Sequence, residues 1–370
     1  MTFIKITREA ILKPLQAVSG IIERRHTLPI LSNVLISRTS NRIEFIATDI
    51  EIEISAATDT TSSDDEPKLV TVGARKLLDI LRALPENSEV SFVHSEKRLQ
   101  VRSGKSRFSL QTLPAEDFPR LAPPEGTPVK FSVPQKLLRA QVDLVQYAMA
   151  QQDIRYYLNG LLMVVEDGLL RLVATDGHRL AYATKELDVK GLSRQEVILP
   201  RKTIIELSKL LEDSDAEVKV ELSATQAKFV FGEITLISKL VDGKFPEYGR
   251  VIPQNQPKKL RMKRTELLAA LQRAAILTSD KFRGVRWVLS DGSLKILCTN
   301  TEQEEAQEEL DVPYQGESLD IGFNVGYLLD VLNNLETEEI DCGLGDANSS
   351  ALITVPDKDD FKYVVMPMRI

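Results

Sequence analysis

The sequence predicts an α+β fold in which three copies of one unit follow one another, each with two helices packed on antiparallel sheets. Two observations predict this fold. Three sequence marks recur at spacings of 124 to 129 residues, and they come in the same order each time. Repetition at a fixed period indicates one structural unit used several times. Helical and alternating patterns within each unit indicate helices lying on antiparallel strands.

The first mark is an extended segment that runs into an amphipathic helix. It begins at Ile4, Phe131 and Leu260. Apolar residues within 11–18 and within 267–275 follow the spacing of one helix face. Each copy is therefore expected to open with a strand followed by a helix.

The second mark is a strand that ends in Thr-Asp or Thr-Asn. The turn residues are Asp49, Asp176 and Asn300. Apolar and polar residues alternate on both sides of the first turn, which is typical of paired strands. Since Asp and Asn side chains accept hydrogen bonds from nearby backbone amides, these residues are expected to shape the turn.

The third mark is a second helix, which begins near Ala74, Pro200 and Asn324. Segments rich in Pro, Gly and polar residues, 121–128 and 253–259, separate the copies and resemble linkers. The sequence therefore predicts three domains, and their expected limits are 1–124, 128–253 and 258–370.

Composition excludes several classes of protein. The 370 residues contain two cysteines, Cys298 and Cys342, far apart and without metal-ligand spacing. That usage suits a reducing cytoplasm and predicts neither disulfides nor a metal site. No apolar run reaches the length of a membrane span. The net charge of −7 disfavours nucleic-acid binding by the whole surface, but acidic residues cluster in runs and leave room for a basic face.

Asp176 and His178 allow two interpretations. An acid beside a rare histidine suggests a hydrolase, because such pairs activate nucleophiles. The same Thr-Asp turn recurs, however, where the sequence has no histidine. The structural interpretation therefore has Asp176 forming a turn and His178 serving in recognition.

Basic residues recur near helix starts, including Arg75, Lys76, Arg201, Lys202 and Arg264. Cations oppose the helix dipole at that end, so they do not serve helix stability. Either they are ordinary solvated residues, or they form one basic face for contact with DNA phosphates. The tyrosine pair in "QQDIRYYLNG" (151–160) similarly fits either a packed core or a platform for nucleic acid.

Together the segments "RYYLNG", "ATDGHRLA", "SKLVDGKFPEY", "KFRGVR", "IGFNVGYLLDVL" and "YVVMPMR" closely resemble the bacterial sliding clamps, the beta subunits of DNA polymerase III. The resemblance covers the whole chain. It implies three domains of the DNA-clamp fold and a head-to-tail homodimer closed into a six-domain ring. The implied function is non-catalytic: the ring encircles duplex DNA, slides, and tethers the replicative polymerase as a processivity factor.

The resemblance also implies site residues. A pocket for partner peptides, between the second and third copies, takes Arg155, Leu158, Thr175, Gly177, His178, Arg179, Leu180, Pro246, Val251, Asn324, Tyr327, Ser350, Val364, Met366, Pro367, Met368 and Arg369. DNA contact falls to Arg24, Arg25, Gln152, Tyr156, Tyr157, Arg201, Lys202 and Arg250. The dimer interface pairs Lys76, Ile80, Lys105, Arg107 and Phe108 with Ile276, Leu277, Glu304 and Glu308.

By the same resemblance the partners are double-stranded DNA, a second copy of the chain, the polymerase catalytic subunit and the clamp loader ATPase complex. Translesion and repair polymerases, mismatch-repair proteins and ligase would bind through short linear motifs. No cofactor and no membrane is expected, and the location is cytoplasmic. Two alternatives remain at this stage: a duplicated clamp specialised for drug resistance, and a protein-binding repeat scaffold without DNA.

Overall fold

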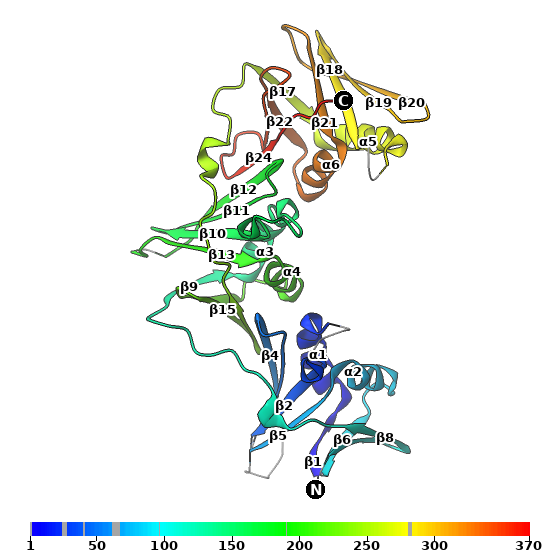
Figure 1. The fold of residues 1–370 in the computed structure, drawn as a ribbon, viewed down its shortest axis with the longest axis vertical. Helices are drawn as coiled ribbons and strands as arrows, with labels where there is room; N and C mark the ends of the chain where they lie inside the picture. Colours follow the sequence, from blue (N-terminus) through cyan, green and yellow to red (C-terminus); the bar gives the residue numbers. More distant parts are fainter. Residues whose placement is uncertain are drawn as a thin grey trace. The chain divides into compact units, whose positions relative to one another are not determined.

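A computed structural model of the chain describes residues 2–23, 28–39, 41–60, 67–95, 97–189, 191–279 and 283–370. The predicted DNA contacts Arg24 and Arg25 lie outside these ranges. The described elements repeat three times in the predicted order (Figure 1). Each copy has a strand, a helix, four strands, a second helix and three strands. The prediction of three α+β repeats with two helices each is confirmed.

The helices begin close to the predicted positions. In the first copy they are α1 (Arg8–Val18) and α2 (Ala74–Ala83), in the second α3 (Gln135–Asp143) and α4 (Arg201–Leu210), and in the third α5 (Arg264–Ala274) and α6 (Val325–Asn334). The α1 helix buries Ile11, Leu15 and Val18 against β3 and β4, as its apolar spacing requires (ranges below). Within their own units, α1 contacts α2 and α5 contacts α6 (Figure 1).

The chain forms two compact units, which do not coincide with the sequence repeats. The first unit contains residues 1–137 and 205–240, and the second contains 138–204 and 241–370. The middle copy is thus divided between them. The predicted domain limits coincide with the ends of the repeats, whereas each compact unit holds one eight-stranded sheet built from strands of two repeats.

The first unit holds two antiparallel sheets. The four-stranded sheet has the order β1 (Thr2–Thr7), β6 (Glu89–Ser95), β7 (Arg98–Ser103), β8 (Ser106–Gln111). The eight-stranded sheet has the order β5 (Lys68–Gly73), β2 (Asn33–Thr39), β3 (Arg42–Thr48), β4 (Ile52–Asp59), β16 (Ile234–Lys239), β15 (Gln226–Phe231), β14 (Glu217–Leu222), β9 (Val129–Pro134). Pairing of β4 with β16 joins strands of the first and second copies.

The second unit repeats this arrangement. Its eight-stranded sheet has the order β13 (Gln195–Pro200), β10 (Gly160–Glu166), β11 (Leu169–Thr175), β12 (Arg179–Glu186), β24 (Phe361–Val365), β23 (Ala351–Thr354), β22 (Glu339–Leu344), β17 (Lys258–Lys263). Its four-stranded sheet has the order β20 (Glu305–Asp311), β19 (Ser293–Thr299), β18 (Gly284–Ser290), β21 (Leu319–Asn324). Here β12 and β24 join the second copy to the third.

Candidate functional site

A pocket lies in the second unit beside the turn between β11 and β12. Its cavity has a volume of about 170 Å³. Three chain segments line it together with that turn: the 3-10 helix η5 (Tyr156–Leu158), the segment around Pro246, and the end of β24. The lining residues are Arg155, Tyr157, Leu158, Thr175, Gly177, Arg179, Leu180, Pro246, Tyr248, Val251, Val364 and Met366.

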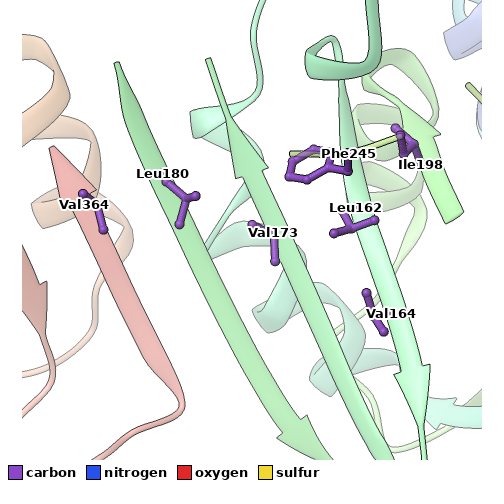
Figure 2. Close-up of a cluster of buried hydrophobic side chains, with 7 residues drawn as sticks. All are labelled: Leu162, Val164, Val173, Leu180, Ile198, Phe245 and Val364. Atoms are coloured by element: carbon purple, nitrogen blue, oxygen red, sulfur yellow. The ribbon is translucent and has the colours of Figure 1, made fainter. Parts of the chain in front are cut away.

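The floor of this pocket belongs to a buried apolar cluster. Leu180 on β12 lies opposite Val364 on β24 in the strand register, and Figure 2 shows both side chains beside Val173 on β11. Phe245 packs in the same cluster, near Ile198. These side chains are at most 4% exposed. Packed strands therefore hold the floor in place, which suits an apolar anchor of a ligand.

The turn between β11 and β12 forms one wall. The Thr175 hydroxyl donates to the carbonyl of Arg179 (2.6 Å) and accepts from the N–H of Gly177 (3.1 Å). The Asp176 Oδ1 accepts from the N–H groups of His178 (2.9 Å) and Arg179 (3.0 Å). Gly177 has a backbone φ of +89°, a value that residues other than glycine rarely adopt.

Equivalent bonds occur in the other two copies. Asp49 Oδ1 accepts two backbone N–H groups at 3.0 and 2.8 Å, and Asn300 Oδ1 accepts two at 3.0 and 2.9 Å. The prediction that these residues shape the turn is confirmed. The Asp176 carboxylate thus binds the backbone of the turn and the Arg179 side chain, while His178 is exposed on the turn.

Arg179 connects three segments of the second unit. Its Nε donates to Asp176 Oδ2 (3.1 Å), its Nη1 to Asp330 on α6, and its Nη2 to the carbonyl of Tyr147 (2.6 Å). The guanidinium also lies 4.4 Å from the ring centre of Tyr327. Its side chain is 10% exposed. All three donor nitrogens are thus engaged, so Arg179 holds the wall of the pocket in position.

Electrostatics around Arg179 favour its charged form. Burial alone would lower the pKa of Arg179, but Tyr363 and the carboxylates of Asp330 and Asp176 outweigh burial and raise it. Tyr363 is itself buried, and this burial raises its pKa. Its hydroxyl donates to the carbonyl of Tyr327 (2.9 Å), which connects β24 to α6, the helix that Arg179 binds from β12.

Arg155 is held at the opposite rim by Asp153. The carboxylate accepts from the backbone N–H (2.8 Å), Nε (3.0 Å) and Nη2 (2.9 Å) of Arg155. These bonds lower the pKa of Asp153 to about 2. A Cβ at Gly177 would lie 2.8 Å from Arg155 Nη2, so the two walls are in close contact. These bonds therefore fix the orientation of the Arg155 side chain at the rim.

The equivalent position in the first copy is filled differently. Glu53 stands where the second copy has Leu180, and it is 3% exposed. Arg120 donates to both carboxylate oxygens (3.0 and 2.9 Å), and the N–H of Leu121 donates to one of them (3.1 Å). The buried Glu53 carboxylate and its partner Arg120, whose side chain is 52% exposed, thus take the place of the apolar floor in the first copy.

Ten of the seventeen predicted pocket residues line the cavity. The other seven lie beside it in the chain or support it. Asn324 caps α6 through the N–H of Gly326 (2.9 Å), and Tyr327 lies against Arg179. His178 is on the turn, Ser350 precedes β23, and Pro367, Met368 and Arg369 follow β24. Whether this set binds a partner stays a prediction.

Two lining residues were not predicted for this pocket. Tyr248 lies in the 3-10 helix η6 (Tyr248–Arg250), two residues after Pro246, and packs against the apolar cluster. Tyr157 was assigned to DNA contact, yet it also packs against this cluster. Tyr157 stands in "RYYLNG" and Tyr248 in "SKLVDGKFPEY", so the signal in the sequence was an aromatic residue in the same motif as a predicted pocket residue.

The remaining DNA-contact candidates are also in the second unit. Tyr156 is 57% exposed and meets Tyr157 edge to face, with ring centres 5.9 Å apart. Arg201 and Lys202 begin α4, and Arg201 Nη1 donates to the carbonyl of Met149 (3.1 Å). Burial and then Arg179 lower the pKa of Arg201. Gln152 is exposed, as is Arg250, which pairs with Glu247 at 2.7 Å.

Three descriptions from one family match the chain almost end to end. They are the N-terminal domain (residues 1–122), the central domain (132–247) and the C-terminal domain (249–369) of the DNA polymerase III beta subunit. The chain belongs to the DNA polymerase III beta subunit family. The beta sliding clamps of Pseudomonas aeruginosa and Escherichia coli K12 are 48% and 45% identical to it over 365 residues, 99% of each chain.

Solved structures of this family agree with the fold. A crystal structure of the DNA polymerase III subunit beta from Pseudomonas aeruginosa has a TM-score of 0.95 at 48% identity and covers 100% of both chains. Caulobacter crescentus pol III beta gives 0.92 at 38% identity, also over 100% of both chains. These matches confirm the clamp fold and favour the sliding-clamp function over the alternatives of a repeat scaffold and a specialised paralogue. Within the described ranges, none of the helices is long and apolar enough to cross a bilayer.

Proposed function

We propose that the chain is the non-catalytic processivity factor of a replicative DNA polymerase. Two copies would join head to tail into a ring of six domains that encircles duplex DNA and slides along it. The pocket of each copy would bind short peptide motifs of partner proteins. The observation that carries this proposal is a pair of equivalent strand junctions within the chain, which leaves the two corresponding strands of the third junction, β8 and β20, at sheet edges.

These free edges are β8 in the first unit and β20 in the second, each the last strand of a four-stranded sheet. In each repeat β4, β12 and β20 follow the Thr-Asp or Thr-Asn turn, and β8, β16 and β24 end the copy. Strand β4 pairs with β16, and β12 pairs with β24. By analogy, the third pairing would join β20 of one chain to β8 of a second chain. An exposed strand edge is a ready site for such pairing.

The two internal junctions share one register. Glu53 faces Ile237 in the first, and Leu180 faces Val364 in the second. Each of these positions is 127 residues beyond its counterpart on the same side of the junction. The junction is therefore a repeated feature, and its register predicts that of the third.

The registers of the hairpins show which residues of β20 and β8 correspond to the residues paired at the internal junctions. Within their hairpins Glu305 occupies the position of Glu53, and Phe108 that of Leu236. Since Leu236 faces Ile54, Phe108 of one copy would face Ala306 of the other. Antiparallel pairing in this register would place Arg107 opposite Gln307, beside the acidic residues of β20.

Exposure and charge support this interface. Ile276 is 77% exposed in the 3-10 helix η7 (Ala275–Leu277), and Phe108 and Ile80 are half-buried. Covering such apolar surface stabilises a dimer. The basic residues Lys76, Lys105 and Arg107 are exposed in the first unit, whereas Glu304 and Glu308 carry negative charge in the second. Arg273 binds both carboxylate oxygens of Glu308 (2.8 and 2.5 Å), whereas Glu304 Oε2 accepts from Asn300 Nδ2 (2.6 Å), so Oε1 of Glu304 could accept from a basic partner.

A substitution tests the interface. Phe108→Asp would place a charge in the proposed apolar contact, and we expect the sedimentation mass at micromolar concentration to fall from dimer to monomer. Leu69→Asp is the matched control, because Leu69 is 51% exposed on another edge strand, β5. Retention of the dimer by the Phe108 variant would contradict the proposed pairing.

DNA retention tests the ring. Loaded on a nicked circular plasmid, the protein should remain bound through gel filtration and dissociate once the plasmid is linearised. Equal loss from circular and linear DNA would refute encirclement. Contacts to the phosphates from Arg201, Lys202 and Arg250 would make residual binding depend on salt. Neutralising Arg201 and Lys202 together should lower the slope of log affinity against log salt by about two units.

The pocket supports recognition of a peptide with apolar anchors. Its floor is buried and apolar, its rim carries Arg155, and Val251 and Met366 are 38% and 40% exposed at the mouth. Methionine adapts to different ligands, which suits a site shared by several partners. Candidate partners are the polymerase catalytic subunit, the clamp loader, repair and translesion polymerases, mismatch-repair proteins and ligase. We expect the protein to act in the cytoplasm.

A further inference from the structure

We propose that Gly322 on β21 and Gly284 on β18 form a slot that fixes the C-terminal tail, residues 366–370, and thereby sets one wall of the pocket. Gly322 is then a positioning residue for partner binding, although it does not line the cavity. The link to partner binding rests on the proposed function of the pocket. The slot itself rests on the contacts of the tail.

Two backbone hydrogen bonds attach the tail to different sheets. The N–H of Met366 donates to the carbonyl of His178 (2.9 Å), next to β12. The N–H of Met368 donates to the carbonyl of Gly322 (2.9 Å), on the edge strand β21 of the four-stranded sheet. The position of Met366 therefore depends on an anchor two residues later, on the second sheet.

The tail passes so close to β21 that a side chain has no room there. A Cβ at Gly322 would lie 2.5 Å from the carbonyl oxygen of Met368 and 2.7 Å from Cδ1 of Ile370. A Cβ at Gly284 would lie 3.1 Å from the side chain of Ile370. Glycine within a strand commonly marks such a close approach of another backbone. The absence of two Cβ atoms thus creates the space in which the tail lies.

Displacement of the tail would change the pocket. To reach ordinary van der Waals contact with an alanine at position 322, the carbonyl of Met368 would have to move by on the order of 1 Å. The obstacle is backbone, so a change of side-chain rotamer does not remove it. Met366 lines the cavity two residues earlier and would lose its fixed position.

The two glycines make different predictions because their obstacles differ. At Gly284 the close atoms belong to the flexible side chain of Ile370, so Gly284→Ala should have a small effect that Ile370→Ala removes. At Gly322 the closest atom is the Met368 carbonyl, so Ile370→Ala should not restore Gly322→Ala. This contrast separates the slot from a general loss of stability.

The experiment measures amide hydrogen exchange of residues 361–370 by mass spectrometry, and binding of a fluorescein-labelled synthetic peptide that carries Gln, Leu and Phe. For the full-length Gly322→Ala protein we expect exchange at Met366 and Met368 to rise at least tenfold and peptide affinity to fall about tenfold. Gly284→Ala should weaken binding about twofold, and the double variant with Ile370→Ala should return to the starting affinity.

Unchanged exchange in the tail of Gly322→Ala would overturn the slot. Faster exchange with unchanged peptide affinity would overturn its link to the pocket. Failure of the unsubstituted protein to bind the peptide would instead refute the proposed function of the pocket. If Gly322→Ala does not fold, the rescue of Gly284→Ala by Ile370→Ala decides the question, and absence of that rescue counts against the slot.

Discussion

Arg179→Lys should destabilise the second unit although it keeps the positive charge. Arg179 makes three hydrogen bonds in which its charge takes part, to Asp176, Asp330 and the carbonyl of Tyr147. A lysine ammonium at that site retains about one of them, because it lacks the planar fork. Each hydrogen bond to a charged group contributes about 1.5–3 kcal/mol. Asp330 is 45% exposed, so water compensates for part of the loss.

The expected destabilisation is therefore about 3 kcal/mol, including the lost contact with the ring of Tyr327. For a unit of this size that corresponds to a decrease of about 6–12 °C in Tm. Differential scanning calorimetry measures this decrease, and the affected transition is the one that includes β12 and α6. The physical reason is burial, because the Arg179 side chain is only 10% exposed.

Arg261→Lys is the matched control. Arg261 also binds an aspartate through two nitrogens, Asp341 at 2.8 and 2.9 Å, but its side chain is 44% exposed. Exposed pairs contribute at most about 1 kcal/mol. If Arg179→Lys melts at the same temperature as Arg261→Lys, Arg179 does not hold the pocket wall, and its role is confined to ligand contact.

Three further predictions concern the turns and rims. Glu53→Gln removes the charge that Arg120 binds. Because Arg120 is half-exposed, the free energy of unfolding of the first unit should fall by only about 1–2 kcal/mol in urea titration, without a change in peptide affinity. Ile50→Gly should raise the free energy of unfolding by about 0.5 kcal/mol, because relief of the strained φ of +72° outweighs the flexibility of glycine. Gly177→Ala, at φ +89°, should lower the free energy of unfolding. If both substitutions changed it in the same direction, the strain argument would be refuted. Asp153 has a pKa of about 2, below its ordinary value, so its stabilising contribution is present above about pH 4 and is lost as pH falls toward 2. Asp153→Asn should remove that part of the pH dependence of stability, which calorimetry measures. It should also weaken peptide binding several-fold, which fluorescence anisotropy measures.

Local sequence patterns predicted much of the fold. Apolar spacing predicted the helices, and Asp49, Asp176 and Asn300 predicted the turns, because helix faces and turns depend on residues a few positions apart. The third of these turns shows the same chemistry with an amide in place of a carboxylate. The combination of motifs over the whole chain also predicted the family, and the comparisons confirm it.

Site residues were predictable only in part. The resemblance supplied ten of the residues that line the pocket, including Leu180 and Met366, but it did not supply Tyr248. Nor did the sequence indicate that Arg179 would donate a hydrogen bond to Asp330, a residue 151 positions away. Such pairs depend on which elements become neighbours after folding, and local spacing carries no information about that.

The sequence alone determined the repeated unit, its turn chemistry and the family. The tertiary structure decided how the repeats share their strands: β4 with β16 and β12 with β24 divide the middle copy between two compact units. It also decided that Glu53 and Arg120 fill in the first copy the place that is a pocket in the second, and that Gly322 lies against the tail. The physical reason is that edge pairing, ion pairs with a buried carboxylate and close backbone approach are contacts between distant segments, and their strength depends on geometry that exists only in the folded chain.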